Sequence, residues 1–362
     1  MKAYQVFRII MMIGLSVLLV SCGTSDSGDD NDDAAECNCD KAPAVEKSGL
    51  VMTLANQEEE IPANVSVLFK VETDVGVPLT NLKSGNFRIF EDDDLISEYE
   101  SRQEILPKPE KFKSHTLLLL DLSGSVLESE SLPILRQAAR SFVDAIMPIP
   151  DEDDFEEIEM GIWWFDGAAD IHPLVPFVTD TDELISGINT IDKNISSDSS
   201  TNLYGAVIQG IAKVEDLTGQ KENIVNIGSV VIFTDGNDQA SRRTKEDALK
   251  AVDNADSDIS VYTIGLGGEI DKDTLKDIGR DDFLFASDID ELVPQFEKIA
   301  DDIREDVRSY YLLEYCSPKR KGSHDLKISA THEGLSGSLT TCFCAEGFKG
   351  GCEISGEDSG EI

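Results

Sequence analysis

Three short segments of this 362-residue chain carry oxygen-bearing side chains at spacings that suit a hard metal ion. The first is Asp121-Leu122-Ser123-Gly124-Ser125, in which a carboxylate and two hydroxyls alternate along a short glycine-containing loop. Ser200-Thr201-Asn202 offers a further hydroxyl, and Thr234-Asp235-Gly236 offers a second carboxylate. Oxygen atoms of this kind are the ligands that Mg2+ and Ca2+ prefer. The candidate metal ligands are Asp121, Ser123, Ser125, Thr201 and Asp235.

The elements around these segments are typical of an α/β sheet. Thr116–Leu120 and Val230–Phe233 are continuous apolar runs, the pattern of strands buried on both faces of a parallel sheet. Strand patterns then alternate with amphipathic helical patterns, the last of which ends near Val307. For residues 113–305 we expect a doubly wound, mostly parallel sheet. Ligands bind such sheets at the carboxyl ends of the strands, where all three segments are expected to lie.

In this order and setting, the segments resemble the von Willebrand factor A family. In that family an Asp-x-Ser-x-Ser loop, a Thr and an Asp build the metal ion-dependent adhesion site. The resemblance covers roughly residues 113–305, and Gly265-Leu266-Gly267 fits it too. It implies Mg2+, or else Mn2+ or Ca2+, with some of the five positions reaching the ion through water. It also implies a binding module for adhesion or complex assembly, whose protein partner offers a carboxylate to the ion.

The histidines give little support to an enzyme. His115 precedes the strand that ends at Asp121, and about 3.3 Å per residue puts it some 17–20 Å from the metal loop. His172, His324 and His332 fall in β-like or loop segments, and the chain has no Gly-x-Ser-x-Gly elbow. We therefore expect that the protein is not an enzyme. A metal-assisted hydrolase and a structural envelope component without metal-dependent activity remain the alternatives.

Antiparallel β patterns flank the predicted domain on both sides. Apolar residues alternate within residues 60–105 and again within 309–346, and Gly and Pro punctuate them. Each segment has too few strands to cover a core, and unpaired edge strands invite aggregation. We expect the two segments to pack together as one β-sandwich, followed by an acidic flexible tail at 347–362. The flanks loosely resemble a bacterial subgroup that frames the domain with immunoglobulin-like strands.

Residues 1–21 have the pattern of a lipoprotein signal peptide. Two basic residues, Lys2 and Arg8, precede an apolar run of twelve, Ile9–Val20, which is too short to span a bilayer. The run ends in Leu19-Val20-Ser21-Cys22, which resembles the lipobox and implies lipidation of Cys22. Gly23 stands where an Asp would suggest inner-membrane retention, so the analogy favours the outer membrane of the bacterial cell envelope.

The charge balance restricts the possible partners. The chain has 71 acidic and 31 basic residues, a net charge of −40, which repels phosphate backbones and anionic headgroups. We therefore expect that the chain does not bind nucleic acid. We expect it to contact the membrane through its lipid anchor only. Residues 22–48 are acidic and poor in large apolar side chains, so we expect a disordered tether there. Its acids lack the spacing of an EF-hand loop.

Six cysteines remain beside Cys22, and an even number in an exported protein favours disulfides. They are Cys37, Cys39, Cys316, Cys342, Cys344 and Cys352. A zinc site is the alternative, but neither closely spaced pair has the two-residue spacer of a zinc knuckle. Cys342 and Cys344 are two apart on a predicted strand and point to one face. We expect Cys316 to bond one of them.

Overall fold

The structure is a computed structural model that describes residues 37, 39, 42–97, 103–107, 112–129, 131–147, 158–221, 224–256, 258–267 and 270–352. The predicted signal peptide, the lipidation of Cys22 and most of the predicted tether lie outside the described residues. Within the described part of the chain, no helix is long and apolar enough to cross a membrane.

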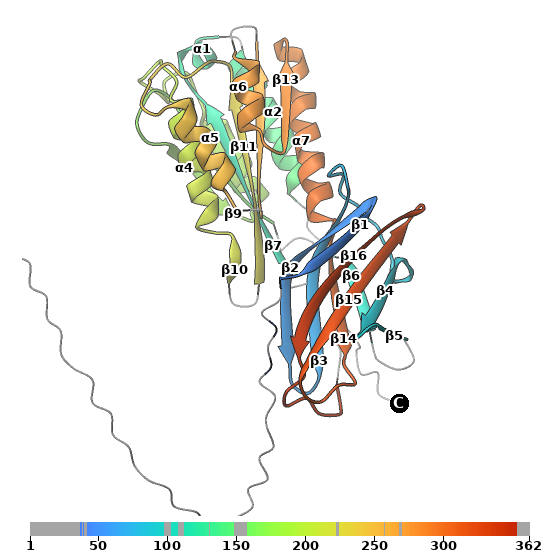
Figure 1. The fold of residues 1–362 in the computed structure, drawn as a ribbon. Coiled ribbons are helices and arrows are strands. Elements are labelled where there is room, and N and C mark those ends of the chain that lie inside the picture. Colours follow the sequence, from blue (N-terminus) through green and yellow to red (C-terminus); the bar gives the residue numbers. More distant parts are fainter. Residues whose placement is uncertain are drawn as a thin grey trace, which may run out of the picture. The chain divides into compact units, whose positions relative to one another are not determined.

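The middle of the chain forms a seven-stranded sheet in the order β13-β12-β11-β7-β8-β9, with β10 paired to β11 (Figure 1). Its strands are β7 (Phe112–Asp121), β8 (Ile158–Phe165), β9 (His172–Val178), β10 (Gly219–Lys221), β11 (Ile224–Thr234), β12 (Ile259–Leu266) and β13 (Asp282–Ala286). The five strands from β13 to β8 run parallel, while β9 and β10 are antiparallel to their neighbours. The predicted α/β fold, with its mostly parallel sheet, is therefore present.

Helices cover both faces of this sheet (Figure 1). They are α1 (Gly124–Leu127), α2 (Ser131–Ile146), α3 (Thr181–Thr190), α4 (Leu203–Glu215), α5 (Lys245–Asn254), α6 (Lys272–Ile278) and α7 (Leu292–Val307). Alternate residues of β7 pack on opposite sides: Leu118 and Leu120 join the core under α2, α3 and α7, whereas Leu117 and Leu119 join the core under α4, α5 and α6. A strand that meets helices on both faces needs apolar residues at every position, which explains its unbroken apolar run.

The flanking segments build two further sheets, both antiparallel. One has the strand order β1-β16-β15-β4-β5 and the other has the order β2-β3-β14-β6. The strands before the α/β part are β1 (Ala44–Ser48), β2 (Leu50–Glu60), β3 (Asn64–Thr73), β4 (Phe87–Glu91), β5 (Asp94–Ile96) and β6 (Gln103–Pro107). Those after it are β14 (Tyr310–Cys316), β15 (Ser323–His332) and β16 (Leu335–Cys344).

Each of these sheets mixes strands from both flanks of the chain. β14 lies between β3 and β6, and β15 lies between β16 and β4. Side chains of both sheets share one apolar core, in which Phe69, Tyr311 and Phe343 are fully buried. Burying apolar area is the main favourable contribution to folding, so this core stabilises the pairing of the two flanks.

The disordered tether expected for residues 22–48 is wrong at its C-terminal end, where the chain is ordered. Ala44–Ser48 forms strand β1, which pairs antiparallel with β16, and the β region thus begins before residue 60. All five residues of β1 are exposed, so no apolar alternation marks the strand. The flexible tail was predicted to begin at residue 347, which is too early in the chain, because Phe348 is buried at 6% exposure.

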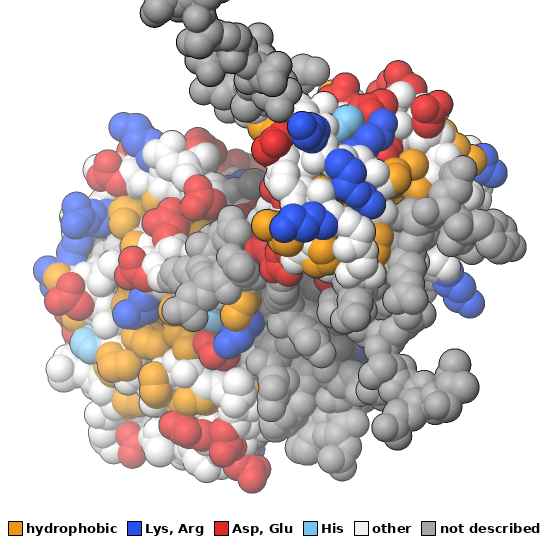
Figure 2. Space-filling view, turned by 90° about the horizontal axis from the view of Figure 1, so that it is seen from below, with side chains coloured by type: hydrophobic (Ala, Val, Ile, Leu, Met, Phe, Trp, Pro, Cys, Tyr) orange, Lys and Arg blue, Asp and Glu red, His pale blue; other side chains and the backbone are white. Residues whose placement is uncertain are grey.

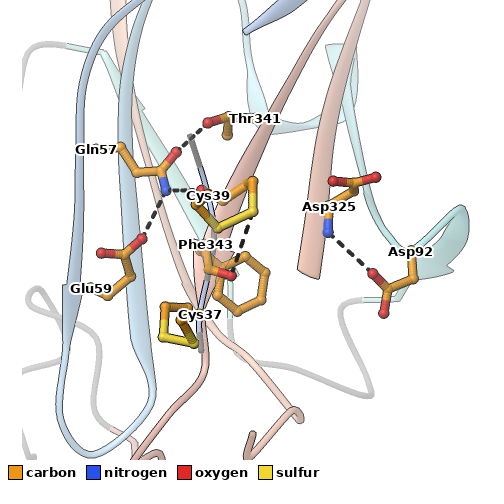
Figure 3. The surroundings of a disulfide bond; sticks show 10 residues. Cys37, Cys39, Gln57, Glu59, Asp92, Asp325, Thr341 and Phe343 are labelled. Atoms are coloured by element: carbon orange, nitrogen blue, oxygen red, sulfur yellow. Dashed lines mark hydrogen bonds between the residues drawn. A yellow bond between two sulfur atoms is a disulfide. The ribbon is translucent and has the colours of Figure 1, made fainter. Parts of the chain in front are cut away.

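All six described cysteines form disulfides: Cys37–Cys344, Cys39–Cys342 and Cys316–Cys352. The expected bond from Cys316 to Cys342 or Cys344 is therefore wrong. The first two bridges run antiparallel, as the β1–β16 pairing does, so Cys37 and Cys39 match the two-residue spacing of their partners. Gln57 of β2 donates to the Cys342 carbonyl at 2.6 Å and accepts from the Thr341 hydroxyl at 2.6 Å, which ties β2 to the same place (Figure 3).

On the face shown in Figure 2, acidic and basic side chains are interspersed with apolar ones. Several bases are paired with acids, as where Lys70 lies 2.7 Å from Asp306 and Lys327 lies 2.9 Å from Glu46. In so acidic a chain, a lysine or arginine that has no ion pair among the described residues is a candidate for contact with an external acidic group.

Candidate metal centre

Asp121 closes β7 at the carboxyl edge of the parallel sheet, where its side chain is completely buried. Its Oδ1 accepts a hydrogen bond from the Ser123 backbone N–H at 2.9 Å. Its Oδ2 accepts from the Thr234 hydroxyl at 2.6 Å. Both oxygens are thus held in place, one by its own loop and one by the end of β11. The carboxylate is fixed in orientation before any ligand binds.

The two serines of the first loop connect Asp121 to the second carboxylate. Ser123 precedes α1, and its hydroxyl lies 3.3 Å from that of Ser125. The Ser125 hydroxyl donates to Asp235 Oδ1 at 2.7 Å. Asp235 comes directly after β11, so the interaction joins the loops that follow two adjacent parallel strands. Four of the five predicted ligands therefore belong to one hydrogen-bonded network.

Thr201 completes the set from a third loop. It is buried at 2% exposure and lies just before α4, whose N-cap is Asn202. A Cβ atom placed on Gly236 would lie 3.8 Å from the Thr201 hydroxyl oxygen, so this hydroxyl borders the loop of Asp235. The first loop is tied to the same region, because the Gly124 N–H donates to the Ser199 carbonyl at 3.0 Å. The structure thus brings the three loops together.

The electrostatics of Asp121 are unfavourable without a nearby cation. Burial, with a smaller contribution from the charge of Asp235, raises the pKa of the Asp121 carboxyl to about 7. The hydrogen bonds from Thr234 and Ser123 act in the opposite direction but do not cancel the effect of burial. Among the described residues, no ion pair joins Asp121 to a lysine, arginine or histidine. A positive ion beside it would supply the missing compensation.

The residues fit a hard divalent ion that keeps part of its water. The set contains two carboxylates and three hydroxyls, all of them oxygen donors, and Mg2+ is commonly bound by one or two carboxylates with waters. Within the described residues, no group of three or more His, Cys, Asp or Glu side chains is placed to hold a metal. A zinc-type site of nitrogen and sulfur ligands is therefore not what these residues offer.

Asp166 is a supporting residue that the sequence reasoning missed. It follows β8, its Oδ2 accepts from the Ser196 hydroxyl at 2.6 Å, and its backbone carbonyl accepts from the Asn202 N–H at 2.8 Å. These bonds fasten the loop of Thr201 to the end of β8. The signal was present, since Phe165-Asp166-Gly167 repeats the pattern of a carboxylate and a glycine after an apolar strand.

The histidines lie in two kinds of surroundings. His115, in β7, is buried, with Nε2 3.0 Å from Asn226 Oδ1 and Nδ1 3.1 Å from Glu159. His172, at the start of β9, lies beside Trp164 and Asp166 of the neighbouring β8 segment. Its ring stacks on Trp164 with centroids 4.1 Å apart, and its Nε2 lies 3.6 Å from Asp166 Oδ1.

Comparison with known proteins gives loose structural likenesses only. No family model and no curated protein match the chain. A von Willebrand factor type A structure from Catenulispora acidiphila is 10% identical over 82% of this chain and 73% of that chain, with a TM-score of 0.45. Proximal thread matrix protein 1 from the mussel byssus is 16% identical over 53% of this chain, with a TM-score of 0.44.

The von Willebrand factor domain of the type V pili tip protein Mfa5 from Porphyromonas gingivalis is 13% identical over 53% of this chain and 95% of that chain, with a TM-score of 0.41. The match to the mussel protein spans only 48% of that protein. With every one of these TM-scores below 0.5, the likenesses assign the chain to no family. The α/β fold is established from the strand order and pairing of the chain itself.

Proposed function

We propose that the α/β part of this chain binds a divalent cation, Mg2+ before Mn2+ or Ca2+, and through it a carboxylate of a protein partner. The single observation that carries the proposal is the setting of Asp121. This carboxylate is fully buried at the carboxyl end of β7, it is oriented by two hydrogen bonds, and the described residues give it no cation. The Thr234 hydroxyl comes from a second loop, and the Thr201 hydroxyl borders that loop at Gly236.

The residues that would hold the ion are Asp121, Ser123, Ser125, Thr201 and Asp235. The bound ion would supply a local positive charge on a chain of net charge −40, so that an acidic partner can approach. The chain's own contribution is preorganisation. Because Ser123 and Thr234 already hold Asp121, little side-chain freedom is left to be lost on binding.

We further propose that this binding takes place at the bacterial cell envelope, in adhesion or in the assembly of a complex. The support is the lipobox-like Leu19-Val20-Ser21-Cys22, which would anchor the chain to the outer membrane by lipid alone. Metabolic labelling with radioactive palmitate tests the anchor. The wild-type protein should be labelled and a Cys22→Ala variant should not, whereas equal labelling of the two would remove this part of the proposal.

The metal proposal is tested first by calorimetry on the chelator-treated protein. Mg2+ or Mn2+ should bind with a stoichiometry near one, Asp121→Ala should lose the ion, and Ser123→Ala and Thr201→Ala should weaken it. A matched control is Asp301→Ala, which removes the same charge from a side chain 69% exposed on α7 and should leave the affinity unchanged.

Partner binding is tested by capture from envelope extracts with and without chelator. Capture should need the ion and should disappear in Asp121→Ala, while the fold survives because the side chain lies at the end of a strand. If capture persists at full strength both in the chelated protein and in Asp121→Ala, the metal centre is not used for binding and the proposal fails.

A further inference from the structure

The loop between β11 and α5 places two adjacent arginines, Arg242 and Arg243, beside the proposed metal centre. Both side chains are exposed. The loop begins at Asp235, a proposed ligand, and continues to Thr244, which caps α5. In a chain with 71 acidic and 31 basic residues, a pair of arginines at this position is a local reversal of charge.

Hydrogen bonds fix this loop to the residues of the metal centre. The backbone N–H groups of Gln239 and Ala240 both donate to the Thr201 carbonyl, at 2.8 and 3.0 Å. The Asp238 carboxylate accepts from the Tyr204 N–H at 3.2 Å and from the Ser241 N–H at 3.0 Å. Three of these bonds attach the loop that carries the arginines to the Thr201 loop and the start of α4, and the bond from Ser241 lies within the arginine loop itself. The arginine loop is therefore held in a fixed position relative to the proposed metal ligand Thr201.

Arg242 is anchored by one of its five donors. Its Nε donates to the Gly167 carbonyl at 2.5 Å. Gly167 packs closely against Ser200, because a Cβ atom added to it would collide with the Ser200 hydroxyl. Ser200 is the neighbour of Thr201 in sequence. The guanidinium of Arg242 is thus held against the loop that supplies a proposed metal ligand.

The remaining donors of Arg242 have no described use. The structure describes no hydrogen bond from Nη1 or Nη2 and no ion pair of Arg242 with any described acid, although Asp198 also lies close to Gly167. Asp198 is already engaged, since its Oδ1 accepts from the N–H and the hydroxyl of Ser200. A guanidinium presents its terminal donors as a planar fork that matches a carboxylate. An external carboxylate is the group that fits.

We infer that Arg242 is a second recognition point beside the metal ion, and that the partner is an acidic protein segment with two nearby carboxylates. One carboxylate binds the ion and the other binds Nη1 and Nη2 of Arg242. The inference rests on the proposed function and specifies the partner of that same site. It explains why this arginine is anchored through Nε, which leaves the bidentate side of the fork for a ligand.

The test uses the mature chain loaded with Mg2+ and short peptides with blocked ends. One peptide carries a single aspartate among glycines, and three others carry two aspartates separated by one, two or three glycines. At least one two-aspartate peptide should bind about fivefold more tightly than the single-aspartate peptide, the size expected of an exposed but well-oriented ion pair. This preference should shrink as the salt concentration rises.

The variants separate Arg242 from charge in general. Arg242→Ala should reduce the preference to that of a single carboxylate, and Arg242→Lys should restore only part of it because lysine lacks the fork. Arg243→Ala is the matched control, since it removes the same charge one residue away and should keep the preference. The affinity for Mg2+ alone should be unchanged in all three variants, which a merely structural role of Arg242 would not predict.

The possible negative results distinguish a failure of the proposed function from a failure of the role of Arg242. If Mg2+ does not bind, the proposed function itself fails. If Mg2+ binds but the preference is absent, or is lost equally in Arg242→Ala and Arg243→Ala, the second recognition point is refuted. A digalacturonate probe that binds more tightly than every peptide would overturn the assignment of a protein segment and point to an acidic glycan.

Discussion

Replacing Asp121 by Asn should stabilise the metal-free protein while abolishing its response to Mg2+. Asn has nearly the same shape, and the existing partners suit it. Its Oδ1 can accept from the Ser123 N–H, and its Nδ2 can donate to the Thr234 hydroxyl, which lies 3.1 Å from the Gly236 carbonyl and can turn to donate there. The substitution therefore removes the buried charge without leaving a polar atom unsatisfied.

The magnitude follows from the pKa of Asp121. Burial raises this pKa from its ordinary value of 3.8 to about 7, so the folded protein binds this proton more tightly than the unfolded chain does. The free energy of unfolding therefore falls as the pH rises from about 4 to about 7, and above that pH the loss is complete. At about 1.4 kcal/mol per pH unit, the ionised carboxylate lowers the free energy of unfolding by about 4 kcal/mol at pH 8.

The assay is urea unfolding of chelator-treated wild type and Asp121→Asn at pH 8 and pH 5, followed by tryptophan fluorescence. The chain has two tryptophans, Trp163 and Trp164, and both lie in β8, which pairs with β7. The variant should be more stable by about 4 kcal/mol at pH 8 and by less than half of that at pH 5. Comparing the two proteins at each pH cancels the self-repulsion of the other acids, which are the same in both.

Addition of Mg2+ at pH 8 should narrow the difference between the two proteins. Mg2+ at about a hundred times its dissociation constant should stabilise the wild type by about 2.7 kcal/mol and leave Asp121→Asn unchanged, so that the variant remains more stable by only about 1 kcal/mol. A variant that is equal to or less stable than the chelated wild type at both pH values would refute the account of Asp121 as an uncompensated buried charge.

Three further predictions follow from the rest of the structure. Peptide mapping without reduction should recover Cys37–Cys344, Cys39–Cys342 and Cys316–Cys352, and free thiols at these positions would contradict the pairing. A fragment of residues 112–307 should unfold cooperatively, whereas one ending at residue 107 should not, because it lacks β14 from the middle of its sheet. Thr234→Val should lower the stability of the Mg2+-free protein by about 1.5–3 kcal/mol, measured in urea, because it removes a hydrogen bond to a buried charged group.

What could be read from the sequence depended on local patterns. The apolar run of β7 ends at a carboxylate, so the position of Asp121 at the strand end followed from the pattern alone. The helix α6 did not, since its seven residues are too short for a clear period. Strand β1 is exposed at all five positions and owes its place to pairing with β16, almost three hundred residues away along the chain. The cysteine pairs depend on the same long-range pairing.

Arg242 shows the same limit at the functional site. Nothing in Ser241-Arg242-Arg243 separates one arginine from the other. The difference arises because Arg242 reaches the carbonyl of Gly167, 75 residues away, and that contact exists only once β8 and β11 have placed their loops at one edge of the sheet. Residue types and spacing were enough to propose the ligands of an ion. The proposed role of Arg242 depends on a contact that forms only when the loops meet.

The chain enters and leaves the α/β part at the end of the sheet that lies away from Asp121. The chain enters this part at Phe112, the start of β7, and Asp121 lies nine residues further along the same strand. At about 3.3 Å per residue, the metal centre is about 30 Å from that entry point. The exit is at the entry edge, since α7 ends at Val307 and Tyr310 begins β14, paired with Lys70 of β3. Both connections therefore lie at the opposite end of the sheet from Asp121, so neither of them runs beside the proposed metal ligands.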